Sequence, residues 1–568
     1  MSYIDNLMGF AKEQIRETVL SALGTLVANG KIPSEPLPAF IVETPADPAN
    51  GDFSCNAAMV CAKALKKNPR EIAALIIEEV GFGGTSASNN TVFKKCETAG
   101  PGFINFYFAE EWYAQVVKCI TEQKEDFGKT DSGKGKRVLI EFVSANPTGP
   151  MHIGNARGGA LGDCLASVLK RAGYYVEREF YVNDAGNQVN KLGLSLDMRY
   201  LQKFGQEIEM PEDSYHGEDI IEHVNNYIKK YGDKLLNVPE EERRAELVNY
   251  ALPLNISGLE EDLGKYRIKY DTWFKESVLH EGGAVTRIIE LLKEKGHTYE
   301  QDGALWLKSS EFGDEKDRVL VRSNGVPTYL VPDIAYHYNK LVERGFDMAV
   351  DILGADHHGY VPRMNAALEA LGINTGRLVV IIMQMVRLSR GGEAVKLSKR
   401  SGKAITLSTL LDEVPLDAAR FFFNLREANT HIDFDLDLAI EESNKNPVYY
   451  VQYAHARICS IIRRLADEGI TCGFPENLAF NERAEFELIK KAASLPSEIN
   501  EAALELNPAR ITRYVQELSQ LFHKFYDSCR IKGEEENVLQ SRLALCHAVK
   551  IALKNALDIL KVDAPEKM

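Results

Sequence analysis

Residues 138–182, VLIEFVSANPTGPMHIGNARGGALGDCLASVLKRAGYYVEREFYV, decide the fold. An apolar run at 138–143 leads through a turn rich in proline and glycine into helical periodicity from about 155 to 172, which Gly173 closes. A second strand-like run follows at 174–182. Strand, helix and strand within about 45 residues form a βαβ unit with two parallel strands and a right-handed crossover. The sequence therefore predicts an α/β fold.

The rest of the chain predicts a multidomain protein. Its 568 residues exceed the size at which one hydrophobic core stops growing, about 250 to 300 residues. We expect three domains: a small α+β domain at 1–115, an α/β domain at 130–410 with a helical insertion at about 190–315, and an all-α bundle at 411–568. The insertion shows no parallel-strand pattern, and a polar linker is predicted at 123–137. Strands are expected to resume at 326–332, 348–354 and 377–383.

Composition narrows the class of protein. Lys and Arg number 67 against 82 Asp and Glu, and the net charge of −15 argues against a histone-like coat on DNA, although a local basic groove stays compatible with it. The nine cysteines form no Cys-x-x-Cys pair, so we expect neither zinc nor a disulfide framework. No signal peptide and no apolar run of about 20 residues is apparent. These features predict a cytoplasmic protein.

The turn PTGPMHIGN at 147–155 is a candidate nucleotide site. It connects the end of a predicted parallel strand to a helix, and ligands of open α/β sheets bind at such strand ends. Free amides at a helix N-terminus favour phosphate, His152 offers a donor, and Gly154 leaves room for a base or ribose. The stretch fits neither G-x-G-x-x-G nor a Walker A loop.

A second candidate is VKLSKRSGKAI at 395–405, where Lys396, Lys399, Arg400 and Lys403 crowd a short loop. Such cations can clamp a triphosphate and stabilise charge in adenylyl transfer. Taken alone, the run is more typical of a solvated loop.

Taken together, HIGN at 152–155 and KLSKR at 396–400 resemble the HIGH and KMSKS signatures of class I aminoacyl-tRNA synthetases. Longer stretches are similar to bacterial-type arginyl-tRNA synthetases: EFVSANPTGPMHIGNARGGALGD at 141–163, YVNDAGNQ at 181–188, ILGADHHGYVPR at 352–363, FDLDLAIEESNKNPVYYVQYAHARI at 434–458 and VDAPEKM at 562–568. The resemblance runs from residue 50 to the end. Asn155, Leu397 and Arg400 depart from the signatures, but Asn155 keeps an amide and Arg400 keeps a positive charge.

The resemblance implies a Rossmann-like catalytic domain that uses ATP with Mg²⁺ to activate L-arginine and then transfers it to the terminal ribose of tRNA(Arg). His152, Asn155, Lys396 and Lys399 would be catalytic, the first two on the ATP phosphates and the lysines on the pentacoordinate state. The implied ATP-binding residues are Pro147, Gly149, His152, Gly154, Asn155, Gly354, Asp356, His357, His358, Met385, Val386, Lys396, Ser398 and Lys399. The Asp-His-His run could instead ligate a metal, although no further ligand cluster with suitable spacing accompanies it.

The resemblance also implies an arginine pocket and tRNA contacts. The implied arginine-binding residues are Glu141, Ser144, Asn146, Tyr329 and Asp333, and carboxylates suit a guanidinium that is always charged. An acid at a helix start is the competing interpretation of Asp333. The implied tRNA-binding residues are Phe53, Arg420, Tyr449, Tyr453 and Arg457, although aromatic residues at helical spacing are often core.

We expect a monomer that binds tRNA and arginine but neither DNA nor membrane. A small-molecule adenylyl or cytidylyl transferase and a catalytically silent tRNA-binding paralogue are the alternatives. The flanking domains disfavour the first, and His152 with the lysine loop disfavours the second.

Overall fold

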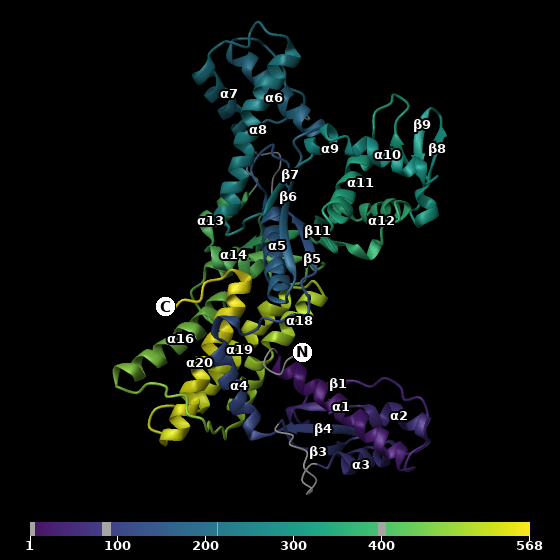
Figure 1. Ribbon diagram of the computed structural model, residues 1–568. Helices are drawn as coiled ribbons and strands as arrows, with labels where there is room; N and C mark the ends of the chain where they lie inside the picture. Colours follow the sequence, from purple (N-terminus) through teal and green to yellow (C-terminus); the bar gives the residue numbers. More distant parts are fainter. Residues whose placement is uncertain (1–5, 82–91, 213, 396–404) are drawn as a thin grey trace.

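The chain is built around a parallel sheet (Figure 1). The computed structural model describes residues 6–81, 92–212, 214–395 and 405–568. Five parallel strands lie in the order β12-β11-β5-β6-β7. Their bounds are β5 (Arg137–Phe142), β6 (Tyr175–Val182), β7 (Thr272–Lys275), β11 (Met348–Gly354) and β12 (Leu378–Met383). The predicted α/β class with a parallel sheet is confirmed.

Helix α5 (Ile153–Arg171) crosses from β5 to β6 and packs so closely that its contact face needs glycine. A Cβ on Gly162 would collide with the ring of Phe142, and a Cβ on Gly159 would lie 2.7 Å from Ile268. This close packing fixes the N-terminus of α5, which carries the HIGN sequence, at the carboxyl end of β5.

The strand order places a topological switch point at β5. The chain leaves β5 for β6 on one side, whereas β11 lies on the other, so a crevice opens beyond the carboxyl ends of β5 and β11. The register also aligns three carboxyl residues across the sheet, because Glu141 on β5 is paired with Glu179 on β6 and with Asp351 on β11. The crevice therefore lies above a row of acids.

A helical arm projects between β6 and β7 (Figure 1, top). It consists of α6 (Asn187–Lys203), α7 (Glu218–Tyr231) and α8 (Glu240–Lys265). The arm has a core of its own, which includes Leu196, Val224 and Leu247. The insertion predicted at about 190–315 is not purely helical, because β7 lies within these residues and belongs to the central sheet. This short edge strand has only four residues, too few for a clear periodicity.

A second arm follows β7. It comprises α9 (Ser277–Glu281), α10 (Ala284–Glu294) and the antiparallel strands β8 (Thr298–Gln301), β9 (Ala304–Leu307) and β10 (Arg318–Val321). Next come α11 (Leu330–Tyr338) and a π-helical turn at Asn339–Glu343, and after β11 comes α12 (Tyr360–Ala370). The strand predicted at 326–332 does not form, because Leu330 begins α11. Pro332 is tolerated in the first turn of that helix.

The N-terminal region forms a separate α+β unit. Helices α1 (Leu7–Ala28), α2 (Ala57–Leu65) and α3 (Pro69–Val80) accompany an antiparallel sheet in the order β1-β2-β4-β3, with bounds β1 (Val42–Glu43), β2 (Phe53–Cys55), β3 (Phe93–Ala99) and β4 (Phe103–Phe108). Phe53 is 3% exposed and packs edge-on against Phe108. The prediction that Phe53 contacts tRNA is therefore wrong, since its ring belongs to the core of this unit.

The C-terminal region is mainly helical. A three-stranded sheet of β13 (Val386–Arg390), β14 (Glu393–Ala394) and β15 (Ile432–Asp435) precedes it, together with α13 (Leu407–Glu413), α14 (Leu416–Phe423) and α15 (Leu436–Ile440). The bundle comprises α16 (Pro447–Asp467), α17 (Arg483–Ala493), α18 (Leu495–Leu504), α19 (Ala509–Ser528) and α20 (Glu536–Leu560), and α4 (Glu110–Gln123) packs against α17 and α20.

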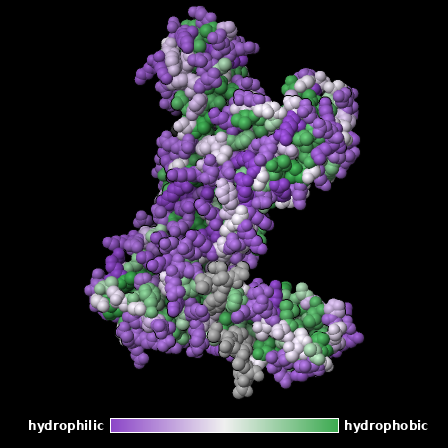
Figure 2. Space-filling model, viewed as in Figure 1, coloured by the Kyte–Doolittle hydropathy of each residue, from purple (hydrophilic) through white to green (hydrophobic). Residues whose placement is uncertain are grey.

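The visible surface of the bundle and of both arms is mainly hydrophilic, with hydrophobic residues in small groups (Figure 2). Among the described residues, no helix combines the length and the apolar character that crossing a membrane requires.

Candidate active site

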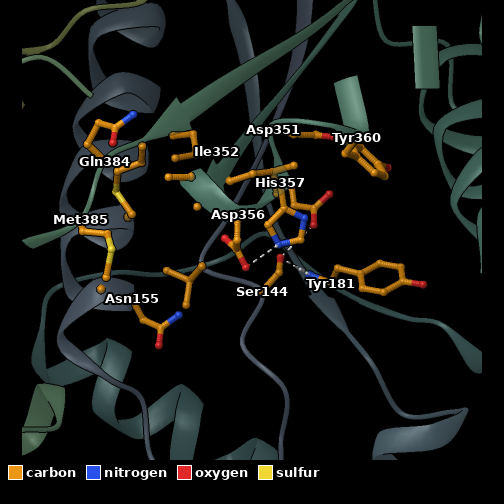
Figure 3. A pocket seen from close by; sticks show the side chains of 18 of the residues that line it. Ser144, Asn155, Tyr181, Asp351, Ile352, Asp356, His357, Tyr360, Gln384 and Met385 are labelled. Atoms are coloured by element: carbon orange, nitrogen blue, oxygen red, sulfur yellow. Dashed lines mark hydrogen bonds and ion pairs between the residues drawn. The ribbon is translucent and has the colours of Figure 1, made fainter. Parts of the chain in front are cut away.

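A cavity of about 810 Å³ opens at the carboxyl ends of β5 and β11 (Figure 3). Asn155 and Met385 lie on one side of it, and Tyr181 and Tyr360 lie on the other. The predicted site residues that line the cavity are Glu141, Ser144, Gly154, Asn155, Asp333, Gly354, Asp356, His357, Met385 and Val386. Residues predicted separately for ATP and for arginine therefore share one cavity.

The chain turns sharply where β5 ends. Val143 and Ser144 adopt φ values of 70° and 40°, in a region that a β-branched residue such as valine rarely occupies. The Ser144 hydroxyl donates to Glu141 Oε1 at 2.9 Å and accepts from the backbone N–H of Tyr181 at 3.1 Å. This hydroxyl ties the strained turn to β5 and β6, which keeps Ser144 on the cavity wall.

The HIGN segment is held as a helix start. The backbone N–H of His152 donates to Asn155 Oδ1 at 3.0 Å, so the Asn155 oxygen caps α5 and its Nδ2 is the group oriented to donate elsewhere. A Cβ built on Gly154 meets no protein atom within 4 Å, so the space beside Gly154 is open to a ligand. The interpretation of Asn155 as a workable replacement for histidine gains a physical basis here.

The segment that follows the lysine motif lies against this helix start. His152 forms an antiparallel bridge with Thr406, and the backbone N–H of Leu407 donates to the Met151 carbonyl at 2.9 Å. Lys396, Ser398, Lys399, Arg400 and Lys403 lie outside the described residues.

A buried lysine lies beneath the cavity. Lys340 Nζ is 2.5 Å from Glu141 Oε2 and 2.9 Å from Asp351 Oδ1, and its side chain is fully buried. Burial alone would lower the pKa of Lys340, but the charges of Asp351 and Glu141 outweigh burial and hold that pKa above its usual value. His337 Nε2 lies 2.7 Å from the second oxygen of Asp351. Glu141 and Asp351 are therefore already paired within the protein.

Asp333 differs from these acids. Burial raises the pKa of its carboxyl to about 7; nearby His337 opposes the shift, and the charge of Glu276 reinforces it. Burial and the charge of Asp333 together raise the pKa of the Tyr360 hydroxyl well above its usual value, and both side chains line the cavity. A cationic group bound there would pair with this carboxylate and offset the cost of its ionisation.

Other predicted residues do not line the cavity. These are Asn146, Pro147, Gly149, His152, Tyr329 and His358. Tyr329 is 63% exposed at the start of α11 and does not belong to the cavity wall. Pro147 and Gly149 belong to the loop between β5 and α5.

The predicted tRNA residues separate into two groups. Tyr449, Tyr453 and Arg457 follow one another at four-residue spacing on α16, the two rings are parallel with centroids 6.4 Å apart, and Arg457 lies 5.7 Å from the Tyr453 ring. Each is partly exposed. Their arrangement suits stacking against unpaired bases.

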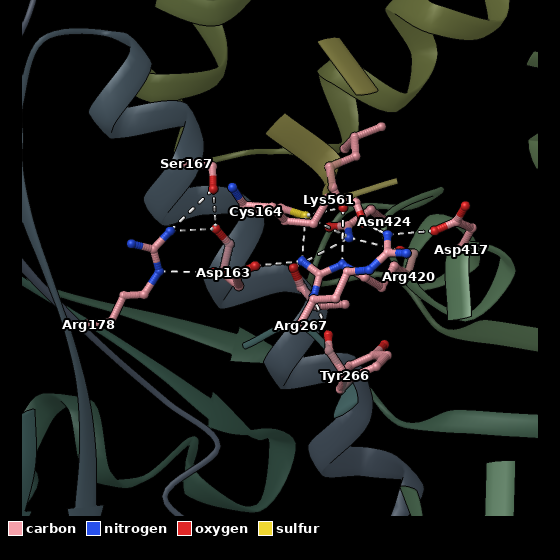
Figure 4. Close-up of polar contacts among 12 residues, drawn as sticks. Asp163, Cys164, Ser167, Arg178, Tyr266, Arg267, Asp417, Arg420, Asn424 and Lys561 are labelled. Atoms are coloured by element: carbon pink, nitrogen blue, oxygen red, sulfur yellow. Dashed lines mark hydrogen bonds and ion pairs between the residues drawn. The ribbon is translucent and has the colours of Figure 1, made fainter. Parts of the chain in front are cut away.

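The prediction for Arg420 is wrong. Its side chain is fully buried and donates to Asp163 Oδ2 at 2.6 Å and to the carbonyls of Tyr266 and Leu560 (Figure 4). Arg178 binds the other Asp163 oxygen at 2.9 Å. Arg420 thus joins α5 to the end of α20 and does not face solvent.

The sequence interpretation also missed residues that build the site: Arg157, Tyr181, Tyr336, His337, Lys340, Asp351 and Tyr360. Fully buried Arg157 donates to the Gln384 carbonyl at 2.5 Å, which fixes the segment before Met385. Asp351 carried a usable signal, since a lone acid within an otherwise apolar strand requires a buried partner.

Comparisons with known proteins match family models to three successive parts of the chain. Residues 12–108 match the family model for the arginyl tRNA synthetase N terminal domain, residues 116–459 the model for tRNA synthetases class I (R), catalytic domain, and residues 451–568 the DALR anticodon binding domain. The chain is 53% identical to an arginine–tRNA ligase of Caldanaerobacter subterraneus subsp. tengcongensis, with all of both chains covered. The chain belongs to the arginyl-tRNA synthetase family.

Further relatives agree with this membership. An arginine–tRNA ligase of Acetivibrio thermocellus is 49% identical, with 99% of this chain and 100% of that one covered. The solved arginyl-tRNA synthetase of Thermus thermophilus is 21% identical, covers 98% of this chain and 100% of its own, and gives a TM-score of 0.73, so it shares the fold. The predicted family and the predicted class of enzyme are confirmed.

Proposed function

We propose that the protein activates L-arginine with ATP and transfers the arginyl group to tRNA(Arg), releasing AMP and diphosphate. The observation that carries this proposal is one cavity with an open helix start at one side and an ionisable carboxyl, Asp333, at the other. The amino-acid carboxylate would attack the α-phosphate of ATP between these two sides.

In the ATP half of the site, positioning and charge do most of the work, since adenylyl transfer asks little covalent chemistry of the protein. The α5 amides and Asn155 Nδ2 would bind phosphate oxygens, with His152 beside them. Lys396 and Lys399 would neutralise charge that develops in the transition state. Met385, at the Asn155 side of the cavity, would contact the adenine.

Mg²⁺ would accompany ATP as its phosphate complex. This ion keeps several waters and binds phosphates with one or two carboxylates. Asp356, whose side chain is 83% exposed at the cavity, fits such a ligand. When bound, Mg²⁺ neutralises part of the triphosphate charge.

In the arginine half, the guanidinium would pair with Asp333, and Glu141 would act mainly through Lys340 and Ser144. A pocket that depends on polar pairing discriminates by about 10⁴ to 10⁵ against ligands that leave its groups unpaired. Neutral isosteres such as citrulline should therefore be poor substrates.

The tRNA would lie along the bundle, with Tyr449, Tyr453 and Arg457 on its anticodon arm. Arg457→Ala should weaken tRNA binding and lower the salt dependence of binding by about one counterion if Arg457 contacts a phosphate. We propose that the enzyme acts as a monomer in the cytoplasm and on tRNA rather than DNA.

The decisive experiment is ATP–pyrophosphate exchange with each amino acid, with and without tRNA. Exchange that depends on arginine supports the proposal. Exchange with another amino acid alone would refute the assignment of arginine, and adenylylation of a small molecule without amino acid would indicate a nucleotidyltransferase.

A further inference from the structure

The helical arm reaches the loop that precedes α5. On α8, Asn255 Nδ2 donates to the backbone carbonyl of Pro147 at 2.9 Å. On α7, His223 Nε2 lies 2.6 Å from Asn255 Oδ1. Two residues of the arm thus form a chain of hydrogen bonds that ends on the candidate ATP loop.

The donor and acceptor roles in this series of hydrogen bonds follow from the groups at its ends. A carbonyl oxygen can only accept, so Asn255 must present its NH₂ group to Pro147 and its oxygen to His223. His223 must then carry a proton on Nε2. Because both groups of the amide are used, neither a carboxylate nor an aliphatic side chain can replace Asn255 without breaking a contact.

The end of the loop is anchored, because the backbone N–H of Leu407 donates to the Met151 carbonyl and Pro147 is buried, but among the described residues its middle makes few other hydrogen bonds. Pro147 and Pro150 lack backbone N–H groups, so this loop cannot continue the ladder of β5. The backbone N–H of Thr148 donates to the Asn146 carbonyl at 2.8 Å, a contact internal to the loop. A Cβ on Gly149 would lie 3.8 Å from Asp219 Oδ2 on α7, so the arm also lies next to the loop at this glycine.

Helix α8 joins two hydrophobic cores. Leu247 packs in the core of the arm, whereas Leu259 packs in the core of the central sheet. Pro253 lies between them and lacks the N–H that would bond to residue 249, which is a common cause of a helix kink. Asn255 follows Pro253 by two residues, so it lies at the junction between the arm and the catalytic core.

We propose that Asn255 and His223 are positioning residues for ATP: through the Pro147 carbonyl they hold the loop that leads into the HIGN helix start. This proposal rests on the proposed function, because the loop matters only if ATP binds beside it. Neither residue lines the cavity, so they act through the loop and do not contact the nucleotide.

The test is steady-state ATP–pyrophosphate exchange with the full-length enzyme and tRNA(Arg), at varied ATP and varied arginine. Asn255→Asp should raise the KM for ATP about tenfold and leave the KM for arginine unchanged, since a lost hydrogen bond changes affinity about two- to tenfold and a carboxylate also repels the carbonyl. His223→Leu should raise the KM for ATP about threefold. His223→Gln can still donate a hydrogen bond, so its KM for ATP should equal that of the wild type. Asn249→Ala, an exposed asparagine on the same helix, is the matched control.

An equal rise in both KM values, or no rise beyond that of Asn249→Ala, would overturn the proposal. Should Asn255→Asp fold poorly by thermal unfolding, the His223 pair decides, because a purely structural role would not separate glutamine from leucine through the KM for ATP alone. Absence of arginine-dependent exchange in the wild-type enzyme would instead refute the proposed function.

Discussion

Arginine binding should depend on pH through Asp333. The structure raises the pKa of this carboxyl to about 7, and a guanidinium pairs with the ionised form, so binding below pH 7 must first release a proton. With a pKa of about 7, the apparent dissociation constant should be multiplied by about 11 at pH 6 and by about 1.1 at pH 8. Affinity should therefore fall about tenfold from pH 8 to pH 6.

Titration calorimetry measures both the affinity and the proton. In buffers of different ionisation enthalpy, arginine binding should release about 0.9 protons at pH 6 and about 0.1 at pH 8. Asp333→Asn is the matched control: it keeps the shape of the side chain, should weaken binding at pH 8 by about 1.5 to 3 kcal/mol, and should remove the pH dependence. Equal affinity at both pH values, or a proton release that survives in Asp333→Asn, would refute the assignment.

The effect of Asp333 on the pH dependence of stability has the opposite sign to that of an ordinary acid whose pKa is lowered by folding. Because the pKa of Asp333 is higher in the folded protein than the ordinary value near 3.8, the folded state binds more protons between about pH 4 and pH 7. Its contribution to the free energy of unfolding thus falls as pH rises through this window. In the absence of arginine, Asp333→Asn should be more stable than the wild type at pH 8, and the difference should shrink toward pH 5.

Three further substitutions test the packing beneath the site. Lys340→Met should lower the free energy of unfolding by about 3 to 5 kcal/mol, measured by urea unfolding, because it leaves two buried carboxylates without their ammonium. Gly162→Ala should cost about 1 to 3 kcal/mol, since the added methyl meets the ring of Phe142, whereas Gly24→Ala, in an open helical position, should be neutral or stabilising in the same thermal unfolding assay. Arg420→Met should lower the thermal midpoint by leaving a buried carboxylate unpaired, and an unchanged midpoint together with weakened tRNA binding would restore the surface role.

The strands that hold the site could be predicted because β5 and β11 are apolar runs with one acid each, and β6 is rich in aromatic and β-branched residues. The observed β5, β6 and β11 differ from the segments predicted at 138–143, 174–182 and 348–354 by at most one residue at either end. Parallel strands buried on both faces need such runs, and glycine and proline bound them clearly. The segment at 326–332 has a similar composition but becomes the start of α11. Local composition could not decide this case, because a short apolar run with proline near its end suits either element.

The buried charges could not be predicted in the same way. Arg420 has the sequence context of a surface residue, and only the meeting of α14, α5 and the end of α20 removes it from solvent. Lys340 lies in a π-helical turn that aims it under β5 and β11, a local geometry with no clear sequence signal. In both cases the partner is more than ten residues away along the chain, so the pairing is a property of the tertiary structure.

The same pairing changes how the arginine pocket selects its substrate. The resemblance implied that both Glu141 and Asp333 bind arginine, but Lys340 already neutralises Glu141 on the row of acids across the sheet. The Lys340 ammonium is shared by two carboxylates, those of Glu141 and Asp351, and Asp333 adds a third acid at the cavity, which leaves an excess of negative charge that favours a cation. Because the carboxyl of Asp333 is partly protonated near pH 7, a neutral ligand would not favour its ionised form. A guanidinium would instead drive its ionisation, so under the proposed function selection for arginine and the release of a proton would be two results of the same buried carboxyl.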